Sequence, residues 1–293
     1  MAKYQGYGQT LEHKLVDTYA RFDKVNAQAT WEPEGGELEF EEGVGGQISS
    51  TLGEYTPQGS AQTEVQSIGL MACALPAEAY ALPPAVVAIQ GGVVGVALAH
   101  LWTTCYIRQL ELSCANGGNL QASYDWRALE EDDLHTIASA AEAIANSPIA
   151  WHGAASLLEV PVGAAGAAFN VMSWTARLVN EFSAQFDQDT AADTIFPSWY
   201  EPGGFYTELD LELRTPPGVS LLVTAGTAIG FSWAADDVET IPKTFTLDMT
   251  GGEGLYVRSR PRELQTGPNG VTWRLTARSK PWDIATWAVT FAA

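Results

Sequence analysis

Carboxylates are the most plentiful side chains in this sequence that could do chemistry. Glu208 and Glu212 lie four residues apart in the segment FYTELDLELRT (205–215), and Glu111 and Asp125 flank an Asn-Gly turn. Two carboxylates on either side of a glycosidic bond can hydrolyse it, and Trp and Tyr commonly line sugar sites. Because the chain has 35 Asp and Glu residues, such pairs also arise by chance. A β-sandwich that binds or hydrolyses glycans is therefore one of the functions to be considered.

Other catalytic and metal-binding patterns are missing from the sequence. The histidines at positions 13, 100, 135 and 152 are scattered, without an HExxH motif or a Cys/His cluster at metal-ligand spacing. No GxSxG motif marks a nucleophilic serine. The glycine-rich stretches 43–46 and 251–254 do not lead into Gly-Lys-Ser/Thr and indicate turns. We therefore expect no enzyme activity, no cofactor and no metal.

The charge is strongly acidic and unevenly distributed. Fifteen Lys and Arg against 35 Asp and Glu give a formal net charge of −20. This balance disfavours tight nucleic-acid binding, which needs basic residues that displace counterions from phosphates. Residues 1–242 hold 8 basic and 31 acidic residues, whereas residues 243–293 hold 7 basic and 4 acidic ones. An acidic body with a basic end could associate head to tail with another copy.

The sequence gives no sign of export or of a membrane span. Three cysteines without a CxxC motif indicate a reducing compartment. The first 14 residues have no apolar signal core. The most apolar window, 82–102, is interrupted by Pro and Gly and is too short for a spanning helix of about 20 residues. We expect one or two buried strands there, in a soluble protein made inside a cell.

Strand patterns dominate the chain. In 205–215 acids alternate with leucines, so successive side chains fall on opposite faces of a strand. Acids spaced roughly 6.6 Å apart on one face repel each other by about 0.6 kcal/mol per pair in water. The segment ELEFEEG (37–43) repeats this pattern. The acids are Glu208, Asp210 and Glu212 in the first segment and Glu37, Glu39 and Glu41 in the second, and the leucines are Leu209, Leu211 and Leu213.

A hairpin and a helix are predicted next to each other. Alternating runs at 106–114 and 120–128 are joined by ANGGN, a strong hairpin signal. The segment 129–148 places Leu134, Ile137 and further apolar residues at helical spacing, with acids in its first turn and Pro148 at its end. We expect this helix over about 130–146, and the segment 65–76 is a weaker helix candidate.

The order of elements resembles a known family. VMSWTARLVNEF (171–182) predicts a strand leading into a polar Asn turn, followed by an acidic stretch with TIFPSWYEPGG and then by the alternating strand. In the first half, GGQISSTLGEYTP runs into VQSIGLMACALP, and YIRQLELSCANGGNLQASYDW follows. This pattern resembles the major tail tube proteins of long-tailed bacteriophages over most of residues 30–290. The resemblance is one of pattern, without a single diagnostic motif.

The resemblance implies a mainly β fold and a structural function. The expected fold is an antiparallel β-sandwich or β-barrel core of tail-tube type with one or two flanking helices. Copies would form rings that stack into a hollow tube, through which DNA passes without tight binding. The implied partners are further copies of the chain and other tail proteins, namely the tape measure, terminator and distal tail proteins, in a virion tail assembled in the host cytoplasm. Another virion protein, such as a tail terminator or decoration protein, is a second alternative.

If the chain is a tail tube protein, the resemblance implies specific functions for its charged residues. Carboxylates lining a channel would repel phosphates, which assigns Glu208, Asp210 and Glu212, and also Glu37, Glu39 and Glu41, to the lumen. Arg258, Arg260 and Arg262 would contact the acidic body of a copy in the next ring. The alternative is an exposed strand with surplus charge.

The predicted organisation has three parts. An N-terminal segment (1–30) precedes a first β half (31–148), and a second β half (149–293) ends in the basic segment. The first half includes a long arm (31–62) that we expect to be mobile in the monomer and ordered in the tube. A faint similarity between residues 107–125 and 172–187 indicates an internal duplication, which leaves both hexameric rings and trimeric rings of duplicated subunits open.

Overall fold

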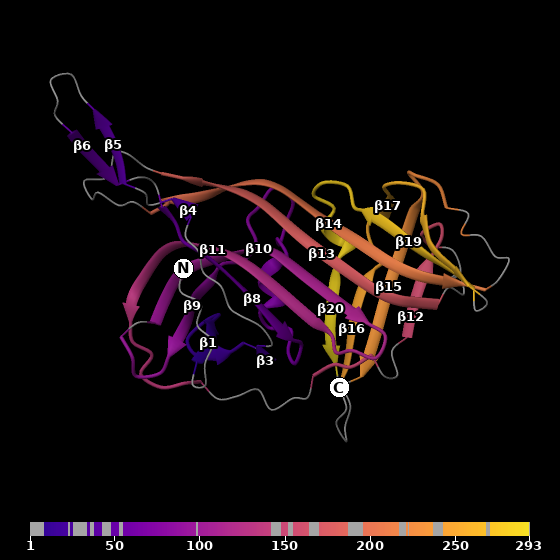
Figure 1. The fold of residues 1–293 in the computed structure, drawn as a ribbon, viewed down its shortest axis with the longest axis horizontal. Coiled ribbons are helices and arrows are strands. Elements are labelled where there is room, and N and C mark those ends of the chain that lie inside the picture. The colour runs from indigo at the N-terminus through magenta and orange to yellow at the C-terminus, as the bar shows by residue number, and fades with distance from the viewer. Residues whose placement is uncertain are drawn as a thin grey trace.

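A computed structural model of the 293-residue chain is shown in Figure 1. The residues that the structure describes are 9–22, 24–25, 34–35, 38–42, 48–52, 55–97, 99–141, 148–151, 155–163, 170–186, 196–216, 221, 223–236, 243–267 and 270–292. Antiparallel strands make up most of them. They form one large open sheet and two separate two-stranded sheets, which confirms the predicted mainly β, sandwich-like class.

The first half is a sheet that curls around an aromatic core. β2 pairs with β1, and β3 pairs with β8, so the short segment 19–25 joins two edges of this sheet. Phe22, between those two strands, packs its ring edge-on against Tyr124, with 5.9 Å between ring centroids. The strands of this half are β1 (Gln9–Lys14), β2 (Tyr19–Arg21), β3 (Lys24–Val25), β8 (Gln58–Glu64), β9 (Val86–Val93), β10 (Ala99–Ala115) and β11 (Gln121–His135).

The second half has two facing layers. One layer has the strand order β12-β15-β16-β20, and the other contains β13, β14 and β19, with β17 and β18 on the far edge of β19. Trp174 of β13 contacts Trp233 of β15 across the layers at 5.1 Å between ring centroids. The strands are β12 (Ala155–Glu159), β13 (Asn170–Gln185), β14 (Trp199–Thr215), β15 (Ala228–Asp236), β16 (Thr244–Met249), β17 (Leu255–Val257), β18 (Arg262–Gly267), β19 (Gly270–Arg278) and β20 (Ala288–Ala292).

Long strands tie the two halves together. One edge of β10 pairs with β9 over residues 100–105 and with β13 over residues 109–115, while its other edge pairs with β11. β13 and β14 then run side by side along their full lengths and extend past this junction (Figure 1). The apolar window 82–102 therefore supplies β9 and the start of β10, which are buried strands, as predicted.

The arm contains four strands besides the start of β8. β4 (Glu34–Gly35) pairs with β7 (Tyr55–Thr56), and β5 (Leu38–Glu42) pairs with β6 (Ile48–Leu52). The β5–β6 hairpin stands off one end of the molecule (Figure 1). The rest of the segment 31–57 lies outside the described residues, and the dependence of the arm's order on assembly stays a prediction.

The prediction of a helix over 129–148 is wrong for the residues of this segment that the structure describes. β11 continues to His135, residues 136–141 are not helical, and residues 142–147 lie outside the described residues. Pairing with β10, up to Ala99↔His135, satisfies the backbone groups that a helix would have used. The hydrogen bonds between β11 and β10 therefore outweigh the helical pattern of this segment. In the weaker candidate 65–76 the described helix is the short 3-10 turn η1 (Met71–Ala74), and a second one is η2 (Ile284–Thr286).

The predicted turn at Asn180 is also wrong. Asn180 lies inside β13, where its buried side-chain amide donates hydrogen bonds to the carbonyls of Ala74 and Ile107 at 2.8 and 2.9 Å. Consequently residues 107–125 form a hairpin, whereas residues 172–185 belong to a single strand. The similarity between those two segments does not reflect a shared hairpin.

The leucines of β14 lie in the core of the second half. Leu211 is fully buried, and its neighbours Leu209 and Leu213 are buried with it, against the tryptophan layer of β13 and β15. Leu211→Ala is expected to lower the free energy of unfolding by about 2–5 kcal/mol, because it leaves a cavity in this layer. Urea unfolding followed by Trp fluorescence measures the loss. A loss below about 1 kcal/mol would contradict a close-packed core at this strand.

His13 gives the first half an acid-sensitive stability. Burial lowers the pKa of His13 to about 4, and its Nδ1 has no hydrogen-bond partner among the described residues. The unfolded chain takes up this proton below pH 6.5, so the native state loses stability as pH falls from 6.5 towards 4, by up to about 3 kcal/mol. Urea unfolding of the wild type and of His13→Gln at pH 7 and pH 4.5 measures this effect. Equal pH dependence in both proteins would contradict it.

Candidate functional site

A polar face with alternating charges crosses four neighbouring strands. In register, Glu111 of β10 lies opposite Arg177 of β13, Arg177 lies opposite Glu208 of β14, and Glu208 lies opposite Arg278 of β19. Asp210 and Glu212 lie two and four residues further along the same face of β14. Opposite charges directly across a strand pair attract, by roughly 0.2–1 kcal/mol per pair. We call this surface the charged sheet face.

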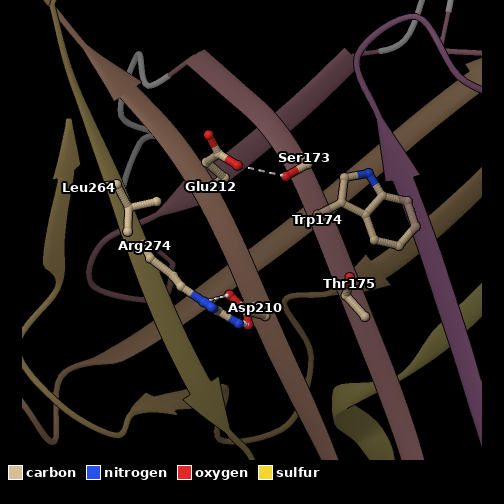
Figure 2. Close-up of a pocket in the computed structure, with 7 residues that line it drawn as sticks. All are labelled: Ser173, Trp174, Thr175, Asp210, Glu212, Leu264 and Arg274. Atoms are coloured by element: carbon tan, nitrogen blue, oxygen red, sulfur yellow. Dashed lines mark hydrogen bonds and ion pairs between the residues drawn. The ribbon is translucent and has the colours of Figure 1, made fainter.

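Two of the three β14 acids form ion pairs with arginines of the C-terminal segment. Arg274 Nε donates to both carboxylate oxygens of Asp210 at 3.0 Å, and its Nη2 also donates to Oδ2 (Figure 2). Arg258 Nη1 donates to Glu208 Oε1 at 3.3 Å. The hydrogen bonds that Arg274 donates to the Asp210 carboxylate raise the pKa of Arg274. These arginines come from positions 50 and 64 residues further along the chain.

The third acid, Glu212, lies beside a shallow hollow. Ser173 Oγ donates to Glu212 Oε2 at 3.4 Å, and Arg274 lies opposite Glu212 in register (Figure 2). The hollow has a volume of about 240 Å³ and is open to solvent. Its lining residues are Ser173, Trp174, Thr175, Asp210, Glu212, Leu264 and Arg274.

Other arginines on this face are engaged in the same way. Arg177 Nε donates to Glu111 Oε2 of the adjacent strand. The guanidinium of Arg278 lies over the ring of Tyr206, 3.4 Å from the ring centroid. The face therefore differs from the row of unopposed acids expected from the sequence, because register brings arginines from three other segments beside it. Its acids and arginines approximately cancel each other.

The other predicted site residues lie elsewhere. Glu39 and Glu41 belong to β5, in a sheet separate from β14, and Glu37 lies outside the described residues. The structure therefore does not bring the two acidic stretches into one sheet. Arg258, Arg260 and Arg262, predicted to contact another copy, are all exposed, and Arg258 binds Glu208 of its own chain.

Two clusters of polar residues were missed by sequence reasoning. Glu131, interpreted as part of a helix entry, accepts a hydrogen bond from the Tyr55 hydroxyl, and its Oε1 lies 2.6 Å from His100 Nδ1. Burial and the bond to Glu131 raise the pKa of Tyr55. This cluster anchors the base of the arm to β11. No local sequence signal links residues 55, 100 and 131, because their contact depends on strand pairing.

The second cluster surrounds the buried carboxylate of Glu12. Gln90 Nε2 donates to Glu12 Oε2 at 2.7 Å, and the backbone N–H of Ala141 donates to Oε1 at 2.8 Å. His135 Nε2 lies 3.1 Å from Gln90 Oε1. These bonds hold the segment that follows β11 onto β1 and β9. We interpret the cluster as structural, because the contacts of Ala141 with Glu12 and of His135 with Gln90 hold this segment in place.

Searches for metal and membrane sites give negative results in the described part of the chain. No group of three or more His, Cys, Asp or Glu residues there could hold a metal ion. None of its helices is long and apolar enough to cross a membrane. The three cysteines are unpaired, and burial raises the pKa of the Cys114 thiol to about 12.

The exposed ion pair between Asp210 and Arg274 should contribute little to stability. A double-mutant cycle with Asp210→Asn and Arg274→Gln is expected to give a coupling of about 0.2–1 kcal/mol, because both groups reach solvent. Glu201→Gln, at an exposed position of the same strand, is the matched control. A coupling above about 2 kcal/mol would show that the charged sheet face is much less hydrated than its exposure indicates.

No protein-family model matches the chain, and a comparison with curated proteins finds no significant match.

Proposed function

We propose that this protein is a structural, self-assembling protein of the tail-tube type, whose copies form stacked rings around a channel for DNA. The observation that carries the proposal is the open sheet. Across β10, β13, β14 and β19 one face of the sheet is buried and the other carries paired acids and arginines. β12, β18 and β20 each pair on one edge only among the described residues. Unpaired strand edges are templates for pairing with another chain. An open sheet of this kind favours assembly.

The charged sheet face is well suited to line such a channel. Three of its arginines, Arg177, Arg258 and Arg274, are held by carboxylates, so a passing phosphate would have to displace a carboxylate before it could bind one of them. The fourth, Arg278, packs over the ring of Tyr206. Free arginines would bind DNA through counterion release and retard its transit. A face whose positive and negative charges cancel does not bind DNA strongly, and it does not need a large uncompensated negative charge to repel it.

The alternative of a glycan hydrolase has less support. Such an enzyme needs one carboxyl group that holds a proton and a second that is ionised. Glu111 and Asp125 each lie within ion-pair distance of an arginine, and so do Glu208 and Asp210. Each of these carboxylates therefore already has a cationic partner in the subunit, and Glu212, the other member of the candidate pair with Glu208, accepts a hydrogen bond from Ser173. A tail terminator or decoration protein would share the sheet but would not form stacked rings.

Negative-stain microscopy of the purified protein tests the proposal. We expect tubes of many stacked rings with a central channel, because open edges and a polar charge distribution favour contacts that repeat. Single rings alone would favour a terminator-like protein. Monomers whose Trp fluorescence changes with added oligosaccharide would favour the glycan-binding alternative.

Releasing the arginines should make the channel retain DNA. The triple variant Glu208→Gln, Asp210→Asn, Glu212→Gln leaves the leucine face unchanged, so we expect it to form tubes. Tubes assembled with labelled duplex DNA should then pellet with it at low salt and release it at high salt, because new phosphate contacts are salt-dependent.

The matched control adds Arg258→Gln, Arg274→Gln and Arg278→Gln to the triple variant. This second protein should lose the DNA retention again. Triple-variant tubes that release DNA as readily as wild-type tubes would contradict a role for the charged sheet face in the channel.

A further inference from the structure

Arg278 differs from the other arginines that lie beside the acids of the charged sheet face. The guanidinium of Arg274 forks onto a carboxylate (Figure 2), and Arg177 and Arg258 also donate to carboxylates. The guanidinium of Arg278 instead lies over the ring of Tyr206, with Cζ 3.4 Å from the ring centroid. In the part of the chain that the structure describes, no carboxylate lies within ion-pair distance of Arg278.

The contact with the ring leaves the hydrogen-bond donors of Arg278 available. A guanidinium that stacks on a ring uses its face, whereas its N–H groups point outwards in the plane of the group. Glu208 lies opposite Arg278 in register, but its Oε1 accepts a hydrogen bond from Arg258 at 3.3 Å. Lys280, two residues after Arg278, forms an ion pair with Glu253. These two acids are therefore engaged by other cations.

The tyrosine ring that carries Arg278 is itself held in place. Tyr206 lies opposite Val179 of β13, and its hydroxyl forms a hydrogen bond with the Glu181 carboxylate. Burial raises the pKa of Tyr206, so the hydroxyl keeps its proton and is the donor of that bond. Gly204 leaves room for the carboxylate, because a β carbon at position 204 would lie 2.7 Å from Glu181 Oε2. A guanidinium positioned in advance loses less entropy when it binds a ligand.

A phosphate group is the ligand that fits these donors. The paired N–H groups of a guanidinium match two oxygens of a phosphate, and arginines that stack on aromatic rings commonly bind nucleic acids. Arg258 and Lys280 are both exposed and lie on either side of Arg278, so their charges add to the attraction for an anion. Tyr256 lies opposite Arg278 on β17 and borders the same position.

We propose that Arg278, held over Tyr206, is the residue of the charged sheet face that binds the phosphodiester groups of DNA in the channel. The inference rests on the proposed function, since it assigns a DNA contact within that channel. A single phosphate contact from each copy is weak and salt-dependent, so it can break and form again as the DNA moves. The contact would guide the DNA along the face, while the arginines held by acids make no contact with it.

Nuclear magnetic resonance of protein labelled with ¹⁵N-arginine tests the site itself. Dimethyl phosphate, a phosphodiester, should shift the Nε–H signal of Arg278 about threefold more than the signals of Arg177 and Arg274, which are held by carboxylates. Sodium chloride at the same ionic strength is the control for screening. The Arg278 signal is assigned by its loss in Arg278→Lys. Solution spectra serve for free subunits, and magic-angle-spinning spectra serve for assembled tubes.

Variants of Tyr206 test whether its ring positions the guanidinium. Tyr206→Leu removes the ring and should abolish the selective shift of the Arg278 signal, although the charge is unchanged. Tyr206→Phe keeps the ring and should keep the shift. Circular dichroism checks that both variants fold. A selective shift of the same size in Tyr206→Leu would overturn the assigned geometry.

DNA retention by tubes tests the same contact in the assembly. Wild-type tubes assembled with labelled duplex DNA should retain a small amount at low salt, and Arg278→Gln tubes should retain less. The slope of log retention against log salt concentration should become shallower by about 1 for each phosphate contact that is lost. Arg214→Gln, which removes the same charge from the same face of β14, is the matched control and should change retention less. Equal losses in the two variants would indicate an effect of overall charge and would overturn the contact.

The two experiments separate this inference from the proposed function. A selective shift of the Arg278 signal in a protein that forms no tubes would support the phosphate site and refute the tube. Tubes without a selective shift would overturn the phosphate site and leave the tube standing. A shift with inorganic phosphate but not with dimethyl phosphate would identify a site for free phosphate and would overturn the DNA contact.

Discussion

The hydrogen-bonded ladder between β13 and β14 is the constraint on which the rest of the structure depends. It runs from Asn170↔Arg214 to Gln185↔Trp199 and passes through both halves of the molecule. Because successive side chains point to opposite faces, this register buries Leu211 and places Asp210 towards solvent. A slip of one residue would bury the acids and expose the leucines. The buried leucines of β14 and the position of its acids on the charged sheet face follow from this pairing.

The open antiparallel sheet exposes two features that other parts of the chain would cover in a compact enzyme. One is a broad polar face, where ion pairs such as Asp210–Arg274 and Glu111–Arg177 balance the charge. The other is a set of strand edges, of which β20 lies beside an apolar groove. Both features have an explanation if copies of the chain complete one another. The acidic excess of the chain then lies largely outside the charged sheet face, where it keeps the subunits soluble.

The sequence predicted those parts of the fold whose signals are local. Strict alternation in 205–215 identified β14 and its buried leucines, and the Asn-Gly turn identified the β10–β11 hairpin. Helical spacing around Leu134 was misleading, because pairing with β10 extends β11 to His135. The acids of β14 were predicted correctly as one row, but their partners were not. Arg274 reaches that row through the pairing of β19 with β14, and Arg258 through the pairing of β17 with β19, and no local pattern encodes either pairing.

We propose that the charged sheet face of this protein lines a channel enclosed by many copies. A helical reconstruction by electron cryomicroscopy of assembled protein tests it most directly, because the position of β14 relative to the tube axis can be read from the map. We expect Glu208, Asp210 and Glu212 to point towards the axis, with Leu209, Leu211 and Leu213 on the side of the subunit core. A map that places these acids on the outer wall, or between subunits, would contradict it.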